Sequence, residues 1–213
     1  MSETQLTSTK RLDPSPGAAA YSRWTLGVYD PLVLGFCGTY VWKCPTREVL
    51  AFYDRHLSAR HLDVGVGTGY FLDRCRFPSP DPTVALLDLN AESLRYTAHR
   101  IRRYHPVSYQ GSALDPVDID LAPFASIGVT YMLHCLPGDM RDKARIFENL
   151  KPLLARDGVL FGTTILGRGV KHNLVARALT HLYMSSRGRW SCRRGSKRPV
   201  LSTLAISLAT KPG

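Results

Sequence analysis

One short segment limits what this chain can fold into more than any other. A predicted strand at about residues 60–65 runs into three alternate glycines, Gly65, Gly67 and Gly69. Glycine adopts backbone conformations with positive φ at little cost, so this spacing predicts a tight turn whose bare backbone can lie against a ligand. A second apolar run ends in Asp88. A strand, a glycine turn, a helix and a strand that ends in a carboxylate form the first half of a nucleotide-binding α/β unit.

The residues around the turn distinguish between two kinds of nucleotide ligand. A dinucleotide site favours G-x-G-x-x-G, because the third glycine lets the helix approach and the pyrophosphate sits at its N-terminus. This chain has Tyr70 at that third position. Asp63 would repel a pyrophosphate but suits a cationic amino-acid ligand, and Asp88 can accept charge-assisted hydrogen bonds from both ribose hydroxyls. The alternative, a glycine-rich turn without a ligand, leaves these two carboxylates unexplained.

Predicted strands and helices alternate along the chain. Hydrophobic periodicity predicts strands at residues 60–65, 83–88, 107–109, 126–131 and 159–165. It predicts helices at residues 46–56, 70–75, 139–154 and 173–183, and one that begins after Asn90, with Thr46 and Asn90 as N-caps. This order predicts an α/β fold, a Rossmann-like, doubly wound and mostly parallel sheet with helices on both faces. Ligands of such sheets bind beyond the carboxyl ends of the strands, where the glycine turn, Asp88 and Ser112 fall.

On these residues the chain resembles the class I S-adenosylmethionine (SAM) dependent methyltransferases, and among them the branch that acts on small molecules. The similarity extends over residues 46–183 and rests on the segments 63–69, 88–90, 111–113, 132–137 and 150–158. It implies that SAM is the cofactor, with its methionine part on Asp63 and the glycine turn, its ribose on Asp88 and its adenine beside Leu89 and Ala113. The full set of implied cofactor-binding residues is Asp63, Gly65, Gly67, Thr68, Gly69, Asp88, Leu89, Asn90, Ser112, Ala113 and Tyr131. Many relatives carry an acid where Ser112 stands, although a serine hydroxyl can still accept a hydrogen bond from the adenine amine.

The resemblance also implies how an acceptor is methylated. Related small-molecule enzymes place a tyrosine of a Tyr-Asp pair over the cofactor, here Tyr29, within an aromatic-rich lid at residues 18–45. Methyl transfer is an in-line displacement that needs alignment and exclusion of water, and a hydroxyl acceptor benefits from a general base. His134, just past the fourth strand, is the candidate base. For both side chains the alternative is ordinary packing, in the core for Tyr29 and after the strand for His134.

Composition narrows the class of protein further. With 44% apolar and 21% charged residues the chain suits a globular domain, and no apolar run approaches the ~20 residues of a membrane span. The polar residues 1–17 predict a disordered lead-in without a signal segment, followed by the SAM-binding domain at residues 18–183. Five cysteines without a C-x-x-C pair and seven histidines without a cluster favour a cytoplasmic protein that has reduced thiols and no metal site.

The positive charge is concentrated in the last quarter of the chain. Residues 158–213 hold 10 Lys and Arg and no acid, whereas residues 1–157 are nearly balanced. Residues 184–213 depart from the family pattern, and their basic stretch 184–198 has three interpretations. It is an arm for nucleic acid or another anionic surface, a solvated linker to one final strand at residues 200–209, or the product of a shifted reading frame. The last two would leave the C-terminal strands incomplete and the fifth strand with a deficient neighbour.

The leading hypothesis is therefore a SAM-dependent methyltransferase that acts on a small organic acceptor. Two alternatives remain open at this point. One is a non-catalytic or defective SAM-binding relative, which the serine at position 112 and the unusual tail favour. The other is an RNA or protein methyltransferase that uses the basic tail.

Overall fold

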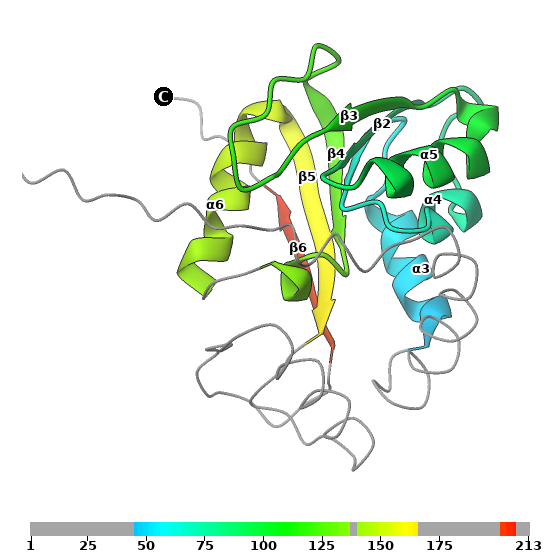
Figure 1. Cartoon of the computed structure of the whole chain (residues 1–213). Helices are drawn as coiled ribbons and strands as arrows, with labels where there is room; N and C mark the ends of the chain where they lie inside the picture. Colours follow the sequence, from blue (N-terminus) through cyan, green and yellow to red (C-terminus); the bar gives the residue numbers. More distant parts are fainter. Residues whose placement is uncertain (1–44, 137–139, 166–200, 208–213) are drawn as a thin grey trace, which may run out of the picture.

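The computed structural model describes residues 45–136, 140–165 and 201–207 of the chain (Figure 1). The lead-in, the residues of the aromatic lid up to 44, the predicted helix at 173–183 and the basic stretch 184–198 lie outside the described residues. The described strands form one sheet in the order β3-β2-β1-β4-β5-β6. No described helix is long and apolar enough to cross a membrane.

The sheet is parallel except at one edge. Its strands are β1 (Arg60–Val64), β2 (Thr83–Asp88), β3 (Val107–Gln110), β4 (Phe124–Thr130), β5 (Leu154–Ile165) and β6 (Leu201–Ser207). Strands β1 to β5 pair in parallel, and β6 runs antiparallel to β5. The chain reverses its strand order between β1 and β4, which is the topology of a doubly wound α/β sheet. The predicted Rossmann-like fold is confirmed.

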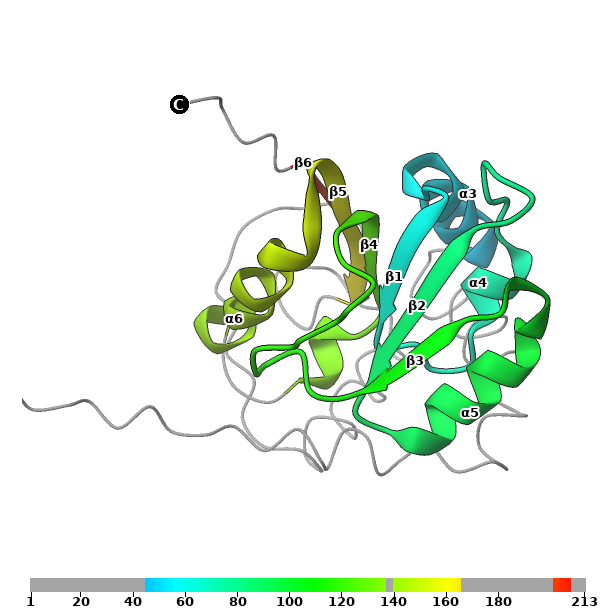
Figure 2. The same ribbon diagram turned by 90° about the horizontal axis from the view of Figure 1, so that it is seen from above.

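Helices cover both faces of this sheet, as Figure 2 shows. The helices are α3 (Thr46–His56), α4 (Tyr70–Arg74), α5 (Ala91–Arg100) and α6 (Met140–Leu150), with short 3-10 helices η2 (Arg102–Tyr104), η3 (Leu133–Cys135) and η4 (Lys151–Leu153). Helices α3, α4 and α5 lie on one face and α6 lies on the other (Figure 2). The predicted N-cap of α5 is confirmed, because the Asn90 side chain accepts hydrogen bonds from the backbone N–H groups of Glu92 and Ser93.

Each face of the sheet has its own buried cluster. On the α6 side Leu62 and Val64 of β1 pack with Ile146 and Leu150 of the helix. On the opposite side Tyr53 of α3 packs in a second cluster with residues of α4, α5 and β5. Side chains alternate along a strand, so His61 and Asp63, which alternate with Leu62 and Val64, face the α3 side. This alternation places Asp63 next to α3 at the end of the strand where the glycine turn begins.

Three predicted bounds need correction, and each has a local cause. Thr46 is the first residue of α3 and not its N-cap, because Pro45 holds the extended conformation that precedes the helix and has no capping side chain. Helix α6 ends at Leu150, earlier than predicted, since Pro152 disfavours the α conformation at Lys151. The other predicted bounds of the described elements before β5 agree with the structure to within two residues, and those of α3 and β2 match it.

Strand β5 begins at Leu154 and not at residue 159. Leu154 pairs with Phe124 and Val159 with Ser126, so five residues of β5 span two of β4. The Asp157-Gly158 pair therefore forms an irregularity inside the strand, a bulge, where the sequence predicted a break before it.

The C-terminal strand closes this side of the sheet. Strand β6 pairs with all seven residues from Val159 to Ile165 of β5. Strand β5 is therefore not left with a deficient neighbour over this length, contrary to the expectation from the tail. The single antiparallel strand predicted within residues 200–209 is present.

Candidate active site

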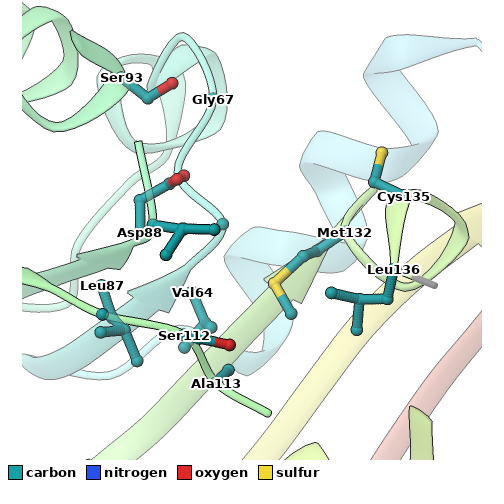
Figure 3. A pocket seen from close by; sticks show the side chains of 13 residues that line it. Val64, Gly67, Leu87, Asp88, Ser93, Ser112, Ala113, Met132, Cys135 and Leu136 are labelled. Carbon is teal, nitrogen blue, oxygen red and sulfur yellow. The ribbon is translucent and has the colours of Figure 1, made fainter. Parts of the chain in front are cut away.

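Two adjoining cavities open at the carboxyl ends of β1, β2 and β4. We call them the Asp88 cavity and the Asp63 cavity. The Asp88 cavity is lined by Val64, Gly65, Gly67, Leu87, Asp88, Leu89, Ser93, Gly111, Ser112, Ala113, Met132, Cys135 and Leu136 (Figure 3). The Asp63 cavity is lined by Asp63, Gly65, Val66, Gly67, Thr68, Gly69, Tyr70, Phe71, Leu72, Thr130 and Tyr131. The two share the backbone of Gly65 and Gly67, so one elongated ligand can occupy both.

The glycine turn presents bare backbone to this space. Gly65, Gly67 and Gly69 have φ values of 74°, 54° and 68°, in the left-handed region that favours glycine. A Cβ added to Gly67 would meet no atom within 4 Å, whereas one on Gly65 would lie 2.6 Å from Met132 Cγ and one on Gly69 2.6 Å from Thr97 Cγ2. Gly65 and Gly69 are therefore packed against protein, and Gly67 faces open space.

Helix α5 holds the turn in place. Thr97 Oγ1 donates a hydrogen bond to the carbonyl oxygen of Gly67 at 3.2 Å, and Arg100 Nη1 donates one to that of Thr68 at 3.1 Å. Arg100 Nε also donates to Asp73 Oδ2 of α4 at 3.1 Å. The carbonyl groups of the turn are thus directed toward α5.

Asp88 ends β2 with its carboxylate in the cavity (Figure 3). The Asn90 N–H donates to Asp88 Oδ1 at 2.8 Å. Burial raises the pKa of Asp88, although hydrogen bonds from the amides of Asn90, Gly67 and Val66 stabilise its charged form. Asn90, predicted to bind the cofactor, lines neither cavity and supports Asp88 and the start of α5 instead.

The predicted adenine-side residues lie together in the Asp88 cavity. Leu89, Ser112 and Ala113 all line it, and Ser112 Oγ accepts a hydrogen bond from Leu114 N at 3.2 Å. Figure 3 shows the facing wall, built from Met132, Cys135 and Leu136. These three residues belong to the segment 132–137, which carries part of the resemblance, but they were not among the predicted cofactor-binding residues.

Asp63 is 7% exposed and lines the second cavity. Tyr53 Oη donates a hydrogen bond to Asp63 Oδ1 at 2.9 Å. The same hydroxyl oxygen of Tyr53 lies 2.9 Å from His61 Nε2. Burial and the charge of Asp63 raise the pKa of Tyr53 well above its usual value, so this hydroxyl keeps its proton. No local pattern in the sequence indicates the hydrogen bond from Tyr53 to Asp63.

A strained residue connects β4 to the far wall. Tyr131 has φ 59°, which is uncommon for a residue other than glycine, and its N–H donates to the Thr163 carbonyl oxygen at 2.8 Å. This conformation turns the chain from β4 into η3. His134 lies on η3 with its ring centroid 6.2 Å from that of Tyr131. It lines neither cavity, and its buried Nδ1 has no hydrogen-bond partner among the described residues.

Comparison with known proteins gives the family. A family model described as a methyltransferase domain matches residues 62–160. Demethylluteothin O-methyltransferase of Streptomyces thioluteus is 35% identical over 182 residues, which cover 85% of this chain and 74% of that protein. This chain belongs to the SAM-dependent methyltransferases. Another member, methyltransferase ctvB of Aspergillus terreus, is 40% identical over 169 residues, covering 76% of this chain and 74% of that protein.

Solved methyltransferase structures share the fold. The structure of the DhpI complex with S-adenosylhomocysteine (SAH) superimposes with a TM-score of 0.53 at 16% identity, covering 70% of this chain and 68% of that one. The N-methyltransferase NodS from Bradyrhizobium japonicum WM9, also in complex with SAH, gives a TM-score of 0.51 at 15% identity, with 75% and 76% covered. This methyltransferase therefore has the class I fold that the sequence predicted.

Proposed function

We propose that this methyltransferase transfers the methyl group of SAM to a hydroxyl group of a small organic acceptor. Two relatives carry names of this kind, the Demethylluteothin enzyme and the Physcion biosynthesis cluster O-methyltransferase of Aspergillus chevalieri, which is 35% identical over 171 residues. The observation that carries the proposal is the pair of joined cavities, which offers one carboxylate to a ribose and a second to an ammonium group.

The residues present fit such a cofactor. The open space beside Gly67 gives an extended ligand room to pass between the two cavities. The Asp88 cavity adjoins the Asp63 cavity at Gly65 and Gly67. Its walls combine one carboxylate with apolar side chains, as a nucleoside requires, and the Asp63 cavity adds a carboxylate suited to a cationic amino-acid group.

In this proposal each residue has a defined task toward the cofactor. Asp88 accepts hydrogen bonds from the ribose hydroxyls, which are charge-assisted and therefore strong. Leu89 and Ala113 flank the adenine, and Ser112 accepts a hydrogen bond from its amine. Asp63 holds the ammonium group, while Thr68, Tyr131 and the three glycines of the turn enclose the rest of the amino-acid part. Asn90 holds Asp88 in position.

The sulfonium of SAM supplies an electrophilic methyl group once the cofactor is bound. The chain then has to align the acceptor and exclude water. We propose that Tyr29 and the lid at residues 18–45 close over the cofactor, where an aromatic face stabilises a cation by about 0.5–2 kcal/mol. Tyr29 lies outside the described residues.

His134 is the proposed general base for the acceptor hydroxyl. Its place after β4, beyond Tyr131 of the Asp63 cavity, supports this role. A buried imidazole nitrogen without a partner is costly unless it acquires one, and an acceptor hydroxyl can supply that hydrogen bond. Taking the hydroxyl proton would make the acceptor oxygen nucleophilic as the methyl group is transferred.

The test is transfer of an isotope-labelled methyl group from SAM to a panel of phenols, alcohols and amines, with bulk RNA and protein as competing acceptors. We expect the label on the oxygen of small phenols or alcohols, and loss of this transfer in His134→Ala with SAH affinity kept. Label found only on RNA or protein would contradict the proposal, as would binding of SAH without transfer to any member of the panel.

A further inference from the structure

A chain of polar side chains, buried except for the half-buried Ser58, lies behind Asp63 and lines neither cavity. It runs from Tyr53 of α3 through His61 of β1 to Ser126 of β4 and Ser58. Tyr53 Oη lies 2.9 Å from His61 Nε2, and His61 Nδ1 lies 2.8 Å from Ser126 Oγ. Ser126 Oγ lies 2.8 Å from Ser58 Oγ, which donates to the Arg60 carbonyl oxygen at 2.9 Å. With the Tyr53–Asp63 bond, the chain has five links that join the ligand-facing carboxylate to the far end of β1.

The partners at the two ends of the chain orient the imidazole. Tyr53 gives its hydrogen to Asp63, so its oxygen accepts one from His61 Nε2. At the other end, Ser58 Oγ donates to the Arg60 carbonyl oxygen, and the Ser58 N–H donates to Ser126 Oγ at 2.9 Å. Ser126 Oγ in turn bonds His61 Nδ1. His61 Nε2 is therefore the donor to Tyr53, and both ring nitrogens have a partner.

The ring of His61 is enclosed by its partners. His61 is fully buried, and its Nε2 lies 3.8 Å from Asp63 Oδ1. A buried polar atom is costly unless it has a hydrogen bond, and both ring nitrogens have one. The ring of Phe161 stacks on His61 with 5.8 Å between centroids, which fixes the orientation of the imidazole.

Gly128 of β4 makes room for the pair. A Cβ at this position would lie 2.9 Å from Asp63 Oδ1 and 3.1 Å from His61 Cε1. The backbone of Gly128 does not have a positive φ, so glycine is needed here for space and not for conformation. The strand has a glycine where the two side chains must approach it.

We propose that His61, through Tyr53, fixes the Asp63 carboxylate for the amino-acid end of the cofactor. Oδ1 is committed to Tyr53, which leaves Oδ2 to receive an ammonium group. Tyr53 and His61 are positioning residues, because they act through Asp63 and line neither cavity. The inference rests on the proposed function, in which Asp63 binds the ammonium of SAM.

The first test is cofactor affinity measured by calorimetry with two probes. SAH carries the ammonium group, whereas methylthioadenosine keeps the nucleoside and lacks the amino-acid part. In Tyr53→Phe, which keeps the ring, we expect SAH affinity to fall roughly tenfold, as for a lost hydrogen bond to a charged group, and methylthioadenosine affinity to stay the same. Tyr109→Phe is the matched control. Tyr109 also donates to an aspartate, Asp120, but this aspartate lines neither cavity, unlike Asp63.

The outcomes separate this inference from the function it rests on. Unchanged SAH affinity in Tyr53→Phe overturns the inference, and so does an equal loss for both probes, which is the mark of a general structural defect. Failure of the wild-type protein to bind SAH overturns the proposed function itself.

The second test needs no cofactor. Nitrogen NMR of protein with labelled histidine, assigned by comparison with His61→Gln, should show a hydrogen on Nε2 of His61, the nitrogen that faces Tyr53. A hydrogen on Nδ1 alone would overturn the link from His61 to Tyr53.

Discussion

At the scale of single residues, two glycines of the same turn have different tasks. A Cβ on Gly67 would enter open space, whereas a Cβ on Gly69 would collide with Thr97. We expect Gly67→Val to remain folded, with a loss of about 1–2 kcal/mol from its left-handed backbone, and to lose SAH binding because the side chain fills the ligand's path. Gly69→Val should lose more stability. Thermal melting and calorimetry on both variants check this, and SAH binding by Gly67→Val at wild-type affinity would contradict it.

Asp88 makes cofactor binding sensitive to acid. Burial raises its pKa, and in the proposed function the ribose hydroxyls bind its ionised form. Affinity should therefore be full above this pKa and fall as the pH drops through it, beginning at a higher pH than an ordinary aspartate would give. Calorimetry of SAH across the acidic range measures the effect. Asp88→Asn cannot ionise at position 88, so its SAH affinity should be weaker and should not show this fall at acidic pH. The same pH profile in both proteins would contradict the role of Asp88.

At the scale of elements, α5 stabilises the glycine turn. Arg100 joins the turn to Asp73 of α4, and both side chains are mostly buried, at 18% and 23% exposure. Burial alone would raise the pKa of Asp73, but hydrogen bonds from Arg103 and Arg100 outweigh it and lower the pKa. This pair therefore contributes stability above the pKa of an unfolded aspartate and loses it as the pH falls through the lowered value.

We expect Arg100→Met to lower the free energy of unfolding by about 1–2 kcal/mol near neutral pH, the cost of hydrogen bonds to a charged group. The matched control on the same helix is Arg95→Met, whose ion pair with Glu92 is exposed and worth about 0.5 kcal/mol or less. Urea unfolding at neutral and acidic pH measures both. Equal losses of unfolding free energy in the two variants would contradict this role of Arg100. So would a loss for Arg100→Met that persists once Asp73 is protonated.

The elements differ in how far the sequence predicts them. Strands β1 and β2, the turn after β1 and the cap of α5 follow from local signals: apolar runs, glycine spacing and an asparagine side chain that reaches its own helix. The bulge in β5 depends on its pairing with β4, which no local pattern encodes. The bond from Tyr53 to Asp63 likewise depends on where α3 docks on the sheet. The residues at strand ends that line the two cavities could therefore be predicted, and the polar chain behind Asp63 could not.

At the scale of the whole molecule, the antiparallel strand β6 protects the sheet. It covers Val159 to Ile165 of β5, which would otherwise present unpaired N–H and C=O groups. We expect a chain that ends at residue 200 to associate or aggregate, because it lacks β6. A chain that ends at residue 207 keeps β6 and is the control. Light scattering after size exclusion compares them, and a truncated protein with the size and melting temperature of the control would contradict this role.

The central claim is that the two joined cavities bind SAM through Asp88 at one end and Asp63 at the other. Calorimetric titration of SAH into the wild-type protein and into Asp88→Ala tests it most directly. We predict that the wild type binds SAH and that Asp88→Ala loses about 1.5–3 kcal/mol of binding free energy, the range for hydrogen bonds to a charged group. Equal affinity in the two proteins would contradict the claim, and so would tight binding of NADH by the wild type.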